Sequence, residues 1–191
     1  MTRLSCLAIV AAVTFAILGM GRGHDLAAQT VIGVEADIVR AIRAGDLPRV
    51  KSLVIQGSNP STADSDGLNG IAIAARNGDY AMVEYLLTVD VPINAQDEIG
   101  NSALLWATED GDVDMAQFLI KNGADVNVRN RRGLTPTMVA ARSGYRDMVE
   151  LYIDNNADLN VRDYTGRGAL DWARDSRTPG MEQVLLNAGA Q

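Results

Sequence analysis

The sequence predicts an all-α fold in which short helix pairs stack into a solenoid. Two observations carry this prediction: glycines recur at a fixed offset of 33 residues, and two apolar segments lie within each period. A period of this size is typical of stacked units that are each too small to bury their own apolar face. Three ladders share the register: Gly67, Gly100, Gly133 and Gly166; Gly45, Gly78, Gly111 and Gly144; and Gly57, Gly123 and Gly189, with Asp90 and Asn156 at the intermediate steps.

The most regular unit shows what each period contains. Thr135 is a good N-cap, and Pro136 suits the first position of a helix. The small residue Ala140 lets this short helix pack closely on its neighbours, and Gly144 supplies a left-handed break. A second apolar helix, a turn at Asn156 and an extended tail follow.

These landmarks resemble those of the ankyrin repeat. The family pattern is a Gly, then Thr-Pro-Leu-His, Ala-Ala, Gly, an apolar helix and Gly-Ala-Asp-Val-Asn, and residues 123–127 match the last element fully. The resemblance extends from about residue 36 to residue 191. It implies an ankyrin repeat solenoid of about five helix-turn-helix units joined by β-hairpin fingers.

The predicted units differ in regularity. The first lacks the Thr-Pro start and suits an N-terminal cap, while Pro92 makes the closing turn of the second irregular. The fifth carries Arg177 where a helix-breaking Gly is expected, which suits a C-terminal cap. The expected units span about residues 36–63, 64–95, 96–128, 129–161 and 162–191.

Equivalent residues one period apart predict the core. Trp stands beside Val in one column, which leaves partial exposure and local repacking of the indoles as open alternatives. The columns are Leu86, Leu119, Tyr152 and Leu185; Leu87, Ile120, Ile153 and Leu186; and Ile73, Trp106, Val139 and Trp172.

Residues 1–28 are predicted to be a secretory signal peptide, followed by a short linker at 29–35. Arg3 gives a positive start, residues 4–18 are apolar, and a Leu-Ala-Ala sequence precedes Gln29. We therefore expect cleavage near Ala28–Gln29 and a periplasmic or secreted chain. The alternative is a membrane anchor that stays uncleaved. The single Cys6 and the single His24 both lie in this segment.

Composition argues against several classes of function. The net charge of −7 disfavours nucleic-acid binding, and after cleavage there is no His or Cys for a catalytic triad or a zinc site. Carboxylate pairs could act as acid and base, but most carboxylates fall on turn positions such as Asp79, Asp112 and Asp147. We expect no catalytic residue, no cofactor and no metal.

Two patterns have metal-binding alternatives. A methionine column is compatible with Cu(I) binding or oxidant sensing. However, the sulfur atoms of successive units would lie too far apart to bind one ion. We therefore prefer a structural role, in which the methionines fill the seam between helices as apolar side chains. Residues 158–163 are similar to the start of a calcium loop but lack its central Gly and terminal Glu. The methionines are Met82, Met115, Met148 and Met181.

The resemblance implies that finger tips and first helices form a concave surface for a partner. Arg129 and Arg162 are repeat equivalents and should be adjacent, in an arginine cluster suited to an acidic patch. The apolar anchors of this surface are expected to be Leu68, Ile99, Leu134 and Tyr164. The alternative is a solvated face with Arg129 paired to Asp97 or Glu98. The candidate site is Arg129, Arg131, Arg132, Leu134, Arg142, Arg162, Tyr164, Arg167, Glu98, Ile99 and Glu109.

The predicted function is a non-catalytic scaffold for protein–protein interaction. We expect a monomer that binds a protein partner, no nucleic acid and, once the signal is removed, no membrane. A dedicated accessory or inhibitor of one exported enzyme or toxin is the alternative. A metal-binding or hydrolytic protein is the third hypothesis.

Overall fold

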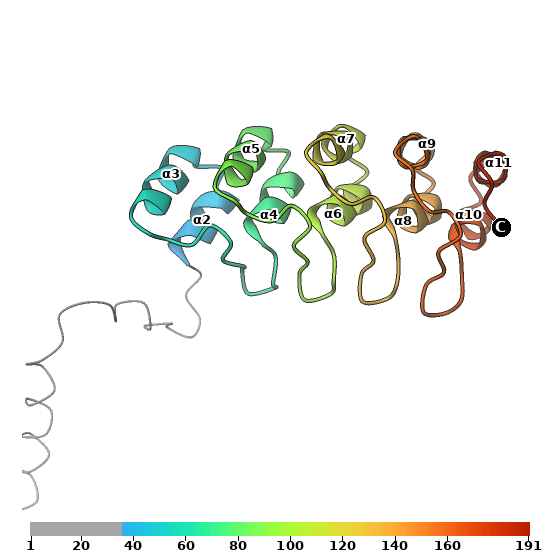
Figure 1. Cartoon of the computed structure of the whole chain (residues 1–191), viewed down its shortest axis with the longest axis horizontal. Helices are drawn as coiled ribbons and strands as arrows, with labels where there is room; N and C mark the ends of the chain where they lie inside the picture. The colour runs from blue at the N-terminus through green and yellow to red at the C-terminus, as the bar shows by residue number, and fades with distance from the viewer. Residues whose placement is uncertain (1–35) are drawn as a thin grey trace, which may run out of the picture. The chain divides into compact units, whose positions relative to one another are not determined.

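A computed structural model describes residues 36–191, so the expected signal peptide and linker lie outside the described residues. This part of the chain is all-helical, as predicted, and its ten helices form five pairs (Figure 1). The pairs are α2 (Asp37–Arg43) with α3 (Leu47–Ile55), α4 (Gly70–Arg76) with α5 (Tyr80–Thr88), α6 (Ala103–Asp110) with α7 (Val113–Lys121), α8 (Pro136–Ser143) with α9 (Arg146–Asp154), and α10 (Ala169–Ser176) with α11 (Met181–Asn187).

The pairs stack side by side in two rows of helices. The first helices α2, α4, α6, α8 and α10 form one row, which we call the inner helices, and the second helices form the other (Figure 1). The loops that precede α4, α6, α8 and α10 project beyond the inner row and form the fingers (Figure 1). No helix within residues 36–191 is long and apolar enough to cross a lipid bilayer.

Side-chain caps define where the helices begin. Asn69, Ser102 and Thr135 each accept a hydrogen bond from the backbone N–H three residues on, as a good N-cap does. Asp79 and Asp112 do the same for α5 and α7. These five caps recur in register because each helix must satisfy its own free N–H groups.

Unit four departs from this second set of caps. Its N-cap position holds Tyr145, which makes no side-chain capping bond. Asp147 is predicted to occupy a turn position, but it lies in the first turn of α9, where the positive end of the helix dipole stabilises its carboxylate.

The left-handed breaks follow the predicted ladders. Gly144 ends α8 with φ of 78°, and Arg177 takes the same role after α10 with φ of 56°. Asp90 and Asn156 are also left-handed, with φ of 61° and 63°. Arg177 carries a side chain in a conformation that favours Gly, which costs about 1 kcal/mol or more.

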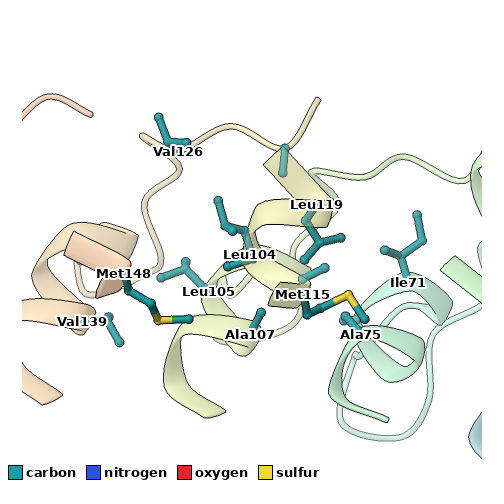
Figure 2. Close-up of a cluster of buried hydrophobic side chains, with 14 of the residues drawn as sticks. Ile71, Ala75, Leu104, Leu105, Ala107, Met115, Leu119, Val126, Val139 and Met148 are labelled. Carbon is teal, nitrogen blue, oxygen red and sulfur yellow. The ribbon is translucent and has the colours of Figure 1, made fainter. Parts of the chain in front are cut away.

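The core lies between the two rows of helices. The column of Leu86, Leu119, Tyr152 and Leu185 is fully buried, whereas Leu186 of the second column is 43% exposed. The methionine column is also fully buried, which supports the seam-filling interpretation. In Figure 2, Met115 extends from α7 toward α4 and Met148 extends from α9 toward α6, so each fills the seam with the preceding unit.

The fingers are loops rather than β-hairpins. No strand is assigned anywhere between residues 36 and 191. The finger of unit three closes with hydrogen bonds from Asp97 N to Asn101 O (3.0 Å) and from Gly100 N to Asp97 O (3.0 Å). Neighbouring fingers share only isolated backbone bonds, such as Arg131 N to Ile99 O at 3.0 Å. Such short pairing shapes a turn but does not build a strand.

Candidate functional site

Each finger is shaped by an Asp or Asn at its first position. Oδ1 of Asp97 accepts from the backbone N–H of Ile99 (2.9 Å) and of Asn101 (2.8 Å). Oδ1 of Asn130 does the same for Arg132 (2.9 Å) and Leu134 (3.0 Å) in the next finger. These side-chain bonds fix the turn, so the two residues after the Asp or Asn are presented at the finger tip.

Two tryptophans connect the fingers to the inner helices. Nε1 of Trp106 donates to Oδ2 of Asp97 at 2.8 Å, and Nε1 of Trp172 donates to Oδ2 of Asp163 at 3.0 Å. Both indoles are partly buried, so partial exposure is the alternative that the structure supports. Arginines cover the rings: the guanidinium of Arg76 lies 4.5 Å from the Trp106 centroid.

Trp172 is covered by two arginines. The guanidinium carbon of Arg167 lies 3.9 Å from the ring centroid and that of Arg142 lies 5.8 Å from it. Burial raises the pKa of Asp163 beneath this ring, but hydrogen bonds from Thr165, the backbone N–H of Arg167 and Trp172 outweigh burial and lower it. Asp163 is therefore a charged structural group.

A column of charges runs along the inner helices. Nη2 of Arg142 lies 3.1 and 3.0 Å from the two carboxylate oxygens of Glu109, its equivalent one unit earlier. Arg76 pairs with Asp110 at 3.4 Å, and Arg167 pairs with Asp175. Three members of the predicted site, Glu109, Arg142 and Arg167, thus neutralise their charge within the chain.

Three other arginines have no acidic partner. In the described part of the chain, no carboxylate oxygen lies within 4 Å of Arg129, Arg131 or Arg132, which we call the unpaired arginine cluster. Nη2 of Arg129 donates to the carbonyl of Arg162 at 2.7 Å, which confirms the expected adjacency. The alternative pairing of Arg129 with Asp97 or Glu98 is wrong.

Arg162 differs from the unpaired arginine cluster. Its Nη1 lies 3.6 Å from the carboxylate of Asp171 and donates to the carbonyl of Gly166 at 3.1 Å. Its charge is compensated within its own unit, so it belongs with the structural arginines.

The predicted apolar anchors fall into two groups. Ile99 and Tyr164 are exposed at finger tips, with 53% and 72% of their surface accessible. Leu68 and Leu134 are buried, with 8% and 3% accessible, so their assignment to a partner-facing surface is wrong. The backbone N–H of each returns to the first residue of its finger, which turns the leucine side chain into the core.

An open pocket of about 390 Å³ lies among the fingers of units three to five. Sequence reasoning named parts of its lining but predicted no pocket, because finger spacing depends on how the units stack. Another pocket, of about 450 Å³, lies near the inner helices of units one to three, where Arg43 and Arg76 meet Asp64 and Asp110. The pocket among the fingers is lined by Gln96, Asp97, Gly100, Arg129, Asn130, Arg131 and Tyr164.

The carboxylates considered for calcium have structural roles. Oδ1 of Asp158 accepts from the backbone N–H of Asn160 at 2.9 Å, and Oδ1 of Asn127 accepts from the backbone N–H of Asp158 at 2.8 Å. Within residues 36–191, no group of three or more His, Cys, Asp or Glu side chains is placed to hold a metal ion.

Comparison with known proteins agrees with this architecture. A family model described as ankyrin repeats (3 copies) matches residues 38–130, and one described as ankyrin repeats (many copies) matches residues 119–173. A search of curated proteins gives no match. The chain belongs to the ankyrin repeat family.

Proposed function

We propose that this chain is a scaffold without chemistry of its own, which binds a partner protein through the finger tips and inner helices of units three to five. Ankyrin repeats are generally protein–protein interaction modules, which supports the general role. Fold alone does not fix the partner or the face, so the choice of face rests on the side chains.

The unpaired arginine cluster is the observation that carries this choice. Arg142, Arg162 and Arg167 already have carboxylate partners, whereas Arg129, Arg131 and Arg132 have none in the described residues. The exposed side chains of Ile99 and Tyr164 lie on the neighbouring finger tips. Arginine beside exposed aromatic and aliphatic side chains is typical of interface hot spots, and its charge favours an acidic partner surface.

Affinity capture with a charge-reversed variant tests this proposal. The full chain and the variant R131E/R132E are immobilised and exposed to extracts of the source cells and their exported fraction. These two side chains make no hydrogen bond or ion pair within residues 36–191, so reversing them should leave the fold intact. We expect a protein that the native chain retains and the variant loses.

A matched control separates this face from net charge. R49E/K121E makes the same change in charge at two exposed residues of α3 and α7, which belong to the row of second helices. It should retain the partner. Equal retention by R131E/R132E would move the binding face elsewhere, and the absence of any retained protein would contradict the scaffold role.

We also propose that residues 1–28 direct export and are removed near Ala28–Gln29, giving a periplasmic or secreted chain. The charged start, apolar run and small residues before Gln29 support this. In that compartment the scaffold would serve as an accessory or inhibitor of one exported enzyme or toxin. N-terminal sequencing should then begin at or near Gln29, and recovery of Cys6 in a membrane fraction would favour an uncleaved anchor instead.

A further inference from the structure

One register position bridges neighbouring fingers, and it holds Gln in unit three but Arg in unit four. Nε2 of Gln96 donates to the carbonyl of Arg129 at 2.8 Å. Nη2 of Arg129 donates to the carbonyl of Arg162 at 2.7 Å. Each side chain therefore reaches the carbonyl of its own equivalent one unit later. Because an amide makes this bridge in unit three, the bridge in unit four does not require a positive charge.

The charge of Arg129 is thus not explained by the fold. Its bridging bond uses one of the five N–H donors of the guanidinium, and no other hydrogen bond to this side chain is present in the described residues. The guanidinium carbon lies 5.4 Å from the centroid of the Tyr164 ring. The carbonyl and the ring hold the cation in place, which lowers the entropy cost of binding an anion.

The surroundings of Arg129 form the pocket between the fingers. Among the described residues, Asp97 is the one acidic residue in the lining of this pocket, and 6% of its surface is exposed. Its carboxylate already accepts hydrogen bonds from two backbone N–H groups and from Trp106. Nδ2 of Asn130 donates to Oδ1 of Asn101 at 3.0 Å. Arg129 and Arg131 therefore supply the charged donors of the pocket that have no acidic partner.

We propose that this pocket binds a single carboxylate group of the partner, with Arg129 as the fixed cation and Arg131, whose side chain makes no hydrogen bond or ion pair within residues 36–191, as the second cation. The inference rests on the proposed function and narrows it from an acidic surface to one inserted group. A planar guanidinium suits a planar carboxylate. A phosphate dianion fits less well, because the Asp97 charge at the pocket wall would repel it more strongly.

The variant R129Q isolates the charge from the bridge. Gln96 already makes the bridging bond, so R129Q should keep the bridge and the fold, and its unfolding temperature should fall only by what the contact with the Tyr164 ring contributes. R49Q makes the same chemical change at an exposed arginine of α3, away from the pocket, and serves as the matched control.

A displayed library of random nonapeptides, selected against the full native chain, supplies the probe. We expect the selected peptides to share one carboxylate, either an Asp or Glu side chain or the C-terminus. Exchange of the side chain to Asn or Gln tests the first source, and C-terminal amidation tests the second. Removing that carboxylate should weaken binding about tenfold or more. R129Q should cause a similar loss, and the two changes together should be no worse than either alone. R49Q should bind as the native chain does.

Several results would overturn the proposal. These are selected peptides without a shared carboxylate, a selection that yields no binder, or peptides that bind R129Q as tightly as the native chain. A captured partner that R129Q retains and R131E/R132E loses would leave the proposed function standing and refute the pocket. If the native chain captures no partner protein, the scaffold role fails, while the peptide experiment still decides whether the pocket takes a carboxylate.

Discussion

The hydroxyl groups of Tyr152 and Thr108 lie 2.6 Å apart inside the solenoid and join α9 of unit four to α6 of the adjacent unit three. Thr108 also donates to the carbonyl of Leu104 at 2.6 Å, so its single hydroxyl proton is used there. Tyr152 must then be the donor of the bond between them. Burial raises the pKa of Tyr152, although the hydrogen bond to Thr108 lowers it in part. The phenol therefore stays neutral across the physiological range.

This pair predicts an asymmetric mutational response. Y152F removes the buried donor and leaves Thr108 bonded to Leu104, so it should lower the free energy of unfolding by about 1 kcal/mol. T108V leaves the Tyr152 hydroxyl buried without a partner and should cost more, about 1–3 kcal/mol. The double variant should lose less than the sum of the two. Urea unfolding followed by circular dichroism measures all three, and simple additivity would contradict the bond.

The buried hydroxyl of Thr137 predicts a stabilising substitution. Thr137 is 1% exposed, and its Oγ1 has no hydrogen-bond partner. Its repeat equivalents are Ile71, Leu104 and Leu170, so this position is otherwise apolar. T137V keeps the shape and removes the unsatisfied group, which should raise the free energy of unfolding by about 1 kcal/mol.

A neighbouring threonine provides the control for T137V. Thr135 is also buried, but its Oγ1 accepts from the backbone N–H of Met138 at 3.3 Å. T135V removes this cap and should destabilise the chain by about 1 kcal/mol. If both substitutions changed stability in the same direction, the assignment of the two hydroxyls would be wrong.

The left-handed residue after α10 predicts a second stabilising change. Gly fits φ of 56° without the steric cost that Arg177 bears, so R177G should raise the free energy of unfolding by about 1 kcal/mol. The reverse change at the equivalent position, G144A, should destabilise the chain by a larger amount. The added methyl group would clash with the hydroxyl of Thr178, and this clash adds to the cost of the left-handed backbone. Thermal unfolding of both variants measures the two effects, and a loss of stability in R177G would contradict the strain argument.

Asp163 predicts how stability falls in acid. Its pKa is lowered in the folded chain, so the unfolded chain takes up a proton first as the pH drops below about 4. The stabilisation from this charge is therefore present above that pH and is lost as the pH falls through the folded pKa. D163N keeps the turn, as Asn130 does in unit four, and should flatten the dependence of the urea midpoint on pH below about 4.

Neutral pH and an exposed carboxylate supply the controls for D163N. Between pH 5 and 7, D163N should not change the slope of stability with pH. D154N changes an exposed carboxylate of α9 and should keep the acid dependence of the native chain. Identical acid profiles for D163N and the native chain would contradict the role of this charge.

The parts of the fold that depend on local chemistry could be predicted from the sequence. Thr135 caps a helix through its own hydroxyl, and Gly144 ends one through its own backbone, so neighbouring residues suffice to predict both. The adjacency of Arg129 and Arg162 followed from their shared register, since equivalent residues in stacked units must be neighbours. Periodicity therefore predicted the helix pairs and their order.

Side-chain partners and directions within the fingers could not be predicted this way. Leu134 follows a glycine in the turn, and register alone did not reveal that its side chain turns back into the core. The pairing of Arg142 with Glu109 joins residues 33 positions apart and depends on the distance between inner helices. Which arginines have an acidic partner could likewise not be predicted from the sequence, because the answer depends on the position of every nearby carboxylate.

The charge column of the inner helices gives the partner-facing surface a longer period than the backbone. Arg76 and Arg142 alternate with Glu109 and Asp175, and Trp106 and Trp172 occur in the units that carry the acidic members. The backbone repeats every 33 residues, but from unit two to unit five this pattern repeats every second unit, and Arg43 in unit one does not continue it. Units three and four are therefore not interchangeable: deleting either one would place like charges together, whereas deleting both would preserve the alternation. Two units, not one, form the natural module for shortening or extending this surface.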